Sequence, residues 1–139
     1  MMDTIAPIRP TLQRERRIPL SAGPAAAAAA RNQVRAAVYA WDVPVDASVA
    51  ILLTSELVTN AIRHEAGGKI VLVITCDCGL LRVDVLDTSR SMPVVVDAPA
   101  DAETGRGLML VASLSTDWGC YRTRVGKAVY FTLAFHADP

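Results

Sequence analysis

The sequence lacks the features of membrane and secreted proteins. It has no continuous run of about 18 apolar residues, the length that a membrane-spanning helix requires. Residues 1–20 are rich in arginine but contain no apolar stretch of the kind found in secretory signals, so we expect a cytoplasmic protein without a membrane partner. Aromatic residues make up only 5% of the chain and hydrophobic residues 52%, which favours a light aliphatic core.

Potential metal-binding side chains are few and scattered. The three cysteines, Cys76, Cys78 and Cys120, form no C-x-x-C pair, and the chain has only two histidines. A structural zinc site needs four ligands at characteristic spacings, which this pattern does not supply. We therefore interpret the cysteines as reduced packing residues.

The chain also lacks an excess of charge of either sign. Its formal net charge is zero, although residues 1–40 hold six arginines against two acids and residues 41–105 hold ten acids against four bases. This balance is not typical of a nucleic-acid-binding protein, so we expect no nucleic-acid partner. A chain of 139 residues can form one ordinary domain. We predict a flexible basic arm over residues 1–15 and a single domain over residues 16–136.

Hydrophobic periodicity predicts helix, helix, strand, strand, helix, strand, strand, with an additional strand at residues 16–20. The helices are expected over residues 25–41, from an N-cap at Asp46 to about His64, and from Gly107 to about Ser113. The later strands are expected over residues 70–76, 80–87, 117–122 and 127–135. Helices on one face of a mainly antiparallel mixed sheet give an α+β fold, a two-layer α/β sandwich.

A polar stripe is predicted on the second helix. Glu56 and Asn60 are four residues apart and share a face, with Arg63 and His64 close to it. If this face packs on the core, a carboxylate and an amide without partners would cost several kcal/mol, so a polar ligand is expected there. The alternative is a stripe in solvent and a core face made of other residues. Those residues are Leu57, Val58, Ala61 and Ile62.

Two further features could contact a nucleotide. Strand alternation places Asp87 at the end of an apolar row that includes Val83 and Val85. A carboxylate there could accept a hydrogen bond from the exocyclic amine of adenine, although an ordinary turn aspartate is the simpler interpretation. Gly105 and Gly107 are at the opening of the predicted short helix, where free amides and the helix dipole attract phosphate.

In this order, the three features resemble motifs of the histidine-kinase-like ATPase superfamily, which has the Bergerat ATP-binding fold. Residues 56–64 resemble its N box, residues 83–87 its first glycine box and residues 105–108 its second. Residues 118–119 and 126–131 resemble the final hairpin of one branch, the anti-sigma-factor serine/threonine kinases.

The resemblance implies ATP and Mg²⁺ as cofactors. It implies that Asn60 holds Mg²⁺, that Glu56 is the general base for a serine hydroxyl, and that Asp87 recognises adenine. The other implied nucleotide contacts are Arg63, His64, Gly105, Arg106, Gly107 and Leu108. Residues 92–104 would form a lid over the phosphates.

The resemblance also implies a function and partners. It implies an anti-sigma-factor-like regulatory protein, a homodimer, that phosphorylates a serine or threonine of an anti-anti-sigma partner and so controls the availability of a sigma factor. The first glycine box departs from the family pattern, because Ser89 and Ser91 replace its glycines. The alternative is therefore a non-catalytic module that binds a nucleotide, or none, and sequesters a protein partner.

Overall fold

The computed structural model describes residues 13–64, 68–90 and 103–136, with side chains from residue 107 onward in the last range. Its elements in chain order are β1 (Arg14–Ser21), α1 (Ala26–Ala40), α2 (Ala47–His64), β2 (Lys69–Asp77), β3 (Leu80–Asp87), α3 (Glu103–Leu114), β4 (Asp117–Arg122) and β5 (Lys127–Ala134). This is the predicted order, including the additional first strand. Residues 1–12 of the predicted arm and residues 92–102 of the predicted lid lie outside the described residues.

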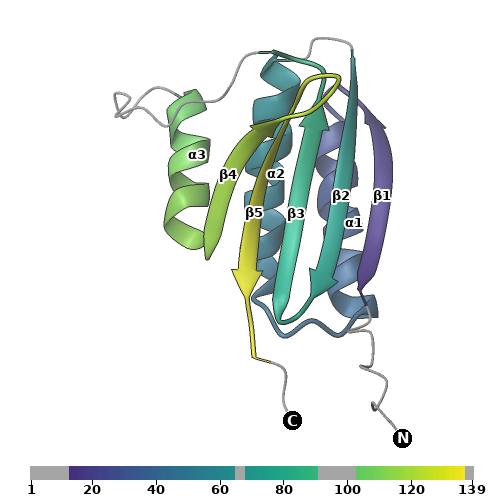
Figure 1. The fold of residues 1–139 in the computed structure, drawn as a ribbon, viewed down its shortest axis with the longest axis vertical. Coiled ribbons are helices and arrows are strands. Elements are labelled where there is room, and N and C mark those ends of the chain that lie inside the picture. The colour runs from purple at the N-terminus through teal and green to yellow at the C-terminus, as the bar shows by residue number, and fades with distance from the viewer. Residues whose placement is uncertain (1–12, 65–67, 91–102, 137–139) are drawn as a thin grey trace, which may run out of the picture.

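The strands form one five-stranded sheet in the order β1-β2-β3-β5-β4. The prediction was a mainly antiparallel mixed sheet, and all the strand pairs of the described sheet are antiparallel. Figure 1 shows α1 and α2 against one face of the sheet and α3 beside β4. The result is the predicted two-layer α+β sandwich.

The core lies between the sheet and α1 and α2. Three alternate residues of β3, Leu81, Val83 and Val85, are at most 1% exposed and face the helices. They share the core with Leu57 and Val58 of α2. None of the described helices is long and apolar enough to cross a membrane.

Local sequence signals fix two of the connections. The Asp46 carboxylate accepts hydrogen bonds from the backbone N–H groups of Ser48 and Val49, at 2.9 and 3.4 Å, which confirms it as the N-cap of α2. The β2–β3 hairpin turns at Cys78 and Gly79, whose φ angles are 50° and 76°. Two positive φ angles in a two-residue turn match the twist of the flanking strands.

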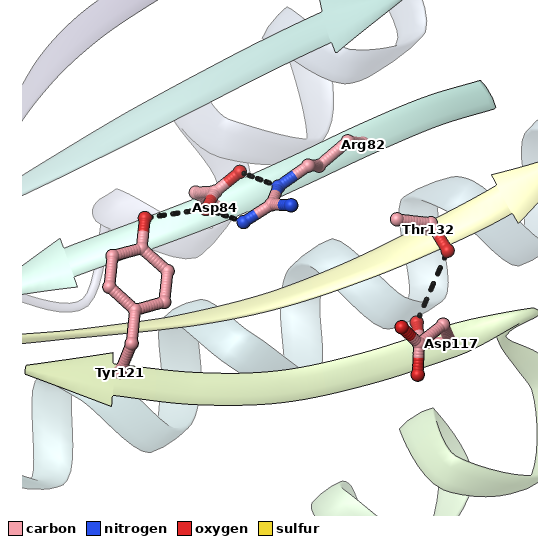
Figure 2. A network of polar contacts seen from close by, with 5 residues as sticks. All are labelled: Arg82, Asp84, Asp117, Tyr121 and Thr132. Carbon is pink, nitrogen blue, oxygen red and sulfur yellow. Dashed lines mark hydrogen bonds and ion pairs between the residues drawn. The ribbon is translucent and has the colours of Figure 1, made fainter.

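A polar network crosses the sheet face that is opposite α1 and α2 (Figure 2). Arg82 donates two hydrogen bonds to Asp84, from Nε at 2.8 Å and from Nη2 at 3.0 Å. The Tyr121 hydroxyl of β4 donates to the same carboxylate at 2.9 Å, and the Arg82 guanidinium lies 4.0 Å from the ring centroid of Tyr130. The network therefore connects β3, β5 and β4 through side chains as well as through backbone pairing.

We predict that Tyr121 makes the stability of the protein sensitive to alkaline pH. Burial raises the pKa of the Tyr121 phenol, and its hydrogen bond to Asp84 raises this pKa further. The neutral phenol is thus favoured in the folded state, and its contribution is complete below about pH 10, the pKa of an unfolded tyrosine. It is lost as pH rises through the higher folded-state pKa. Urea unfolding at increasing pH should therefore show a steeper loss of stability in wild type than in Tyr121→Phe.

The matched control is Tyr39→Phe, because Tyr39 is 74% exposed. This variant should keep the wild-type pH profile. Identical profiles for wild type and Tyr121→Phe would contradict the role of the network.

Candidate functional site

The sequence-predicted residues gather at one end of the molecule. The C-terminal ends of α2 and β3, the N-terminal end of α3 and the turn between β4 and β5 all lie at the upper end in Figure 1. Asn60, Asp87 and Gly107 belong to three of these segments. Residues that are far apart in the sequence therefore lie at the same end of the folded chain.

Asn60 is the most unusual residue of α2. It is 6% exposed, and neither Nδ2 nor Oδ1 of its amide has a hydrogen-bond partner in the part of the chain that the structure describes. A buried amide that has lost water without gaining a partner costs about 1–3 kcal/mol for each unsatisfied group. A ligand that offers a cation, a donor or an acceptor would remove this cost.

The predicted polar stripe divides along the helix. Asn60 is buried, Glu56 and His64 are half-buried, and Arg63 is exposed. The alternative core face is partly right, since three of its four residues are buried: Leu57, Val58 and Ala61. Asn60 is buried nevertheless, so the helix buries part of its polar stripe and an apolar face at once.

Asp87 is at the end of β3, where it is 3% exposed. Its Oδ1 accepts a hydrogen bond from the backbone N–H of Ser89 at 2.8 Å. Lys127, its register partner on β5, is fully buried and places Nζ 3.1 Å from Oδ1 and 3.0 Å from Oδ2. The carboxylate is thus paired with an ammonium that the sequence analysis did not assign to the site.

The backbone at Asp87 is in close contact with Gly126, which precedes Lys127. A Cβ placed on Gly126 would lie 2.0 Å from the Asp87 carbonyl oxygen and 2.6 Å from Cα of Thr88. No side chain fits at this distance. The glycine therefore permits the close approach that brings Lys127 opposite Asp87.

The prediction for the glycines of the second motif needs a correction. The short helix was expected to begin at Gly107, but α3 begins at Glu103, so Gly105 and Gly107 lie in its first two turns rather than in a preceding turn. A glycine in a helix costs about 1 kcal/mol relative to alanine, which packing of α3 can outweigh. A Cβ on Gly107 would be 3.7 Å from the Glu56 side chain, so Gly107 lies directly against the predicted catalytic residue.

The other predicted nucleotide contacts in α3 are Leu108, Gly105 and Arg106. Leu108 is 1% exposed and packs in the hydrophobic core. It supports α3 from the inside and does not offer its side chain to a ligand at the surface. For Gly105 and Arg106 the structure describes only the backbone, within α3.

Comparison with known families agrees with this arrangement. The model of the histidine kinase-like ATPase domain matches residues 20–133, which is most of the chain. The chain belongs to the histidine kinase-like ATPase domain family. A search of curated proteins found no match.

Membership of the histidine kinase-like ATPase family implies an ATP-binding domain. The residues present fit ATP with Mg²⁺. The unsatisfied Asn60 amide offers a carbonyl oxygen, a ligand type that suits a hard cation such as Mg²⁺. The described residues contain no group of three or more histidine, cysteine, aspartate or glutamate side chains that could hold a metal.

Sequence reasoning missed Lys127, although a signal for it was present. Strand alternation in β5 places Lys127 on the same face as Val129, Phe131 and Leu133. A lysine in an otherwise apolar row requires a buried counter-charge, and Asp87 was the only acid predicted to end an apolar row.

We predict that Gly126→Ala strongly destabilises the protein. The added methyl would overlap with the Asp87 backbone, so β5 or the segment after β3 must shift. We expect a loss of about 2 kcal/mol or more in the free energy of unfolding, measured by urea denaturation. Gly23→Ala is the matched control, because a Cβ there has no neighbour within 4 Å. Equal stability of the two variants would contradict the close packing at Asp87.

Proposed function

We propose that this chain is an anti-sigma-factor-like regulatory kinase. It binds ATP with Mg²⁺ and transfers the γ-phosphoryl group to a serine or threonine of an anti-anti-sigma protein. The observation on which the proposal rests is the buried Asn60 amide, which lies one helical turn from Glu56 and has no hydrogen-bond partner within the described residues. A structural amide in a core normally finds a partner, whereas a ligand-binding amide gains one on binding.

The proposed nucleotide lies across the end of the molecule where α2, β3 and α3 meet. Asp87 would accept a hydrogen bond from the adenine amine, and Asn60 Oδ1 would hold Mg²⁺ with the phosphates. The N-terminal half of α3 would face the phosphates, where backbone N–H groups and the positive end of the helix dipole favour negative charge. His64 and Arg63 at the end of α2 are proposed to contact the phosphates or the ribose.

Glu56 is the proposed general base. Its side chain is half-buried and lies against Gly107 of α3, so it lies beside the helix that would face the phosphates. The carboxylate would take the proton of the substrate hydroxyl while that oxygen attacks the γ-phosphorus. The bond from the γ-phosphorus to the β–γ bridging oxygen breaks, and ADP is the leaving group. The Mg²⁺ ion would neutralise the charge that develops on the phosphate oxygens.

The proposed partners rest on the resemblance of residues 118–119 and 126–131 to the final hairpin of the anti-sigma-factor kinases. They are a sigma factor that the protein sequesters and an anti-anti-sigma protein that it phosphorylates. A homodimer is part of the same proposal. This assignment is an analogy at the level of the family.

One observation favours a second function, a non-catalytic module that sequesters a partner with or without nucleotide. The side chains of Asp87 and Lys127 are already paired and are 1% and 0% exposed, so a base can reach them only if neighbouring groups move. Ser89 occupies a position where relatives have glycine, and its backbone N–H donates a hydrogen bond to the Asp87 carboxylate.

We predict that Asn60→Ala removes Mg²⁺-dependent nucleotide binding without destabilising the fold. The amide has no hydrogen bond to lose within the described residues, and its removal relieves two unsatisfied buried groups, so the free energy of unfolding should not fall. Calorimetric titration with ATP and Mg²⁺ should show at least about tenfold weaker binding than in wild type, roughly 1.4 kcal/mol. In EDTA the two proteins should bind ATP equally.

Two further variants complete the design. Ser48→Ala, at the opposite end of α2, should bind as wild type does. Glu56→Gln should retain ATP binding but lose phosphoryl transfer to an anti-anti-sigma protein, measured with ATP labelled at the γ-phosphate. Full transfer by Glu56→Gln would overturn the kinase assignment, and absence of ATP binding by wild type would support the nucleotide-independent module.

A further inference from the structure

The charged pair at the ends of β3 and β5 has unused hydrogen-bonding capacity. Lys127 is among the largest fully buried side chains of the described residues, and Asp87 is its ion-pair partner. An ammonium has three N–H donors, and among the described residues Nζ makes one hydrogen bond, to Asp87 Oδ1. At least one further N–H can therefore be given to a ligand.

The carboxylate is also incompletely used. Oδ1 accepts from Ser89 N–H and from Lys127, whereas Oδ2 lies 3.0 Å from Nζ but has no well-aligned hydrogen bond within the described residues. Both Nζ and Oδ2 are screened from water, so any hydrogen bond that they make to a ligand is strong and its loss is costly. An acceptor and a donor, side by side and each with capacity left, form a two-point recognition element.

The Asp87–Lys127 pair lies on the face of the sheet that the helices cover. Asp87 and Lys127 occupy the face that carries Val83, Val85 and Val129, which is the face covered by the helices. The ends of β3 and β5 that bear the pair lie toward the same end of the molecule as the C-terminal end of α2 and the N-terminal end of α3 (Figure 1). A base that reached Asp87 would therefore meet Lys127 as well.

We propose that Lys127 is a specificity-determining residue for the nucleotide, because its ammonium donates a hydrogen bond to N1 of adenine while Asp87 Oδ2 accepts one from the N6 amine. This inference rests on the proposed ATP site. The amine and N1 are neighbours on the adenine edge, one a donor and the other an acceptor, and so they match the order of Oδ2 and Nζ. Guanine has an acceptor at position 6 and an N–H at position 1, so in the same placement each would face a group of its own kind.

Nucleotide analogues test this contact atom by atom. The probes are ATP, GTP and 1-deaza-ATP, in which a C–H group replaces N1, titrated with Mg²⁺ into the full chain by calorimetry. Wild type should bind 1-deaza-ATP about tenfold or more weakly than ATP, because a charge-assisted hydrogen bond is lost. It should bind GTP more weakly than ATP as well.

The matching variants are Lys127→Met and the double variant Asp87→Asn with Lys127→Met. Lys127→Met alone leaves a buried carboxylate without its counter-charge and can fail to fold, whereas the double variant removes both charges and keeps the side-chain volumes. In the variant that folds, ATP and 1-deaza-ATP should bind with equal affinity. If the lysine were merely structural, replacing it would instead weaken the binding of both nucleotides by the same factor. The ratio of the two affinities would then keep its wild-type value.

The outcomes separate the inference from the proposed function. If wild type binds ATP and 1-deaza-ATP equally, the Lys127 contact is wrong and the ATP site stands. If GTP binds more tightly than ATP, the adenine assignment is wrong. If wild type binds no nucleotide, the ATP site is wrong and the Lys127 contact with it.

Discussion

A buried ion pair joins the ends of two strands, β3 and β5, in the candidate site. Antiparallel register places Asp87, the last residue of β3, opposite Lys127, the first residue of β5. Removing one member of such a pair typically costs about 3–5 kcal/mol, because the other charge remains buried without a partner. The pair therefore fixes where these strands end relative to each other, and Gly126 permits the close backbone contact beside it.

The buried polar groups of the described residues differ in whether they have hydrogen-bond partners. On the far face of the sheet, Asp84 is buried but accepts hydrogen bonds from Arg82 and Tyr121. In α2, the Thr54 hydroxyl donates to the Ala50 carbonyl. The Asn60 amide, Asp87 Oδ2, Asp77 Oδ1 and Ser115 Oγ lack such hydrogen bonds within the described residues. Asn60 and Asp87 belong to the segments that meet at one end of the molecule. An unsatisfied buried side chain calls for an explanation, and a ligand that binds at this end of the molecule would supply one for Asn60 and Asp87.

Much of the fold could be predicted because its signals are local. The Asp46 N-cap and the alternation in β3 each depend on a few neighbouring residues, and each prediction is confirmed. The start of α3 was wrong because two glycines look like a turn in sequence, whereas packing against α2 holds them in a helix.

The candidate site was predictable only in part. Asn60 and Asp87 could be proposed from their spacing and from strand alternation. Their environments depend on contacts between distant residues, and the ion pair to Lys127 joins positions 40 residues apart. No local pattern specifies such a contact, since it follows from the register of β3 with β5. The roles of all the predicted site residues, Asn60 and Asp87 included, stay predictions.

The most direct test of the ATP site is a crystal structure of the protein with Mg²⁺ and a non-hydrolysable ATP analogue. The proposal predicts the base beside Asp87 and Lys127, Mg²⁺ at about 2.1 Å from Asn60 Oδ1, and the phosphates at the N-terminal half of α3. A nucleotide bound elsewhere, or a base that makes no contact with Asp87, would contradict the proposed ATP site.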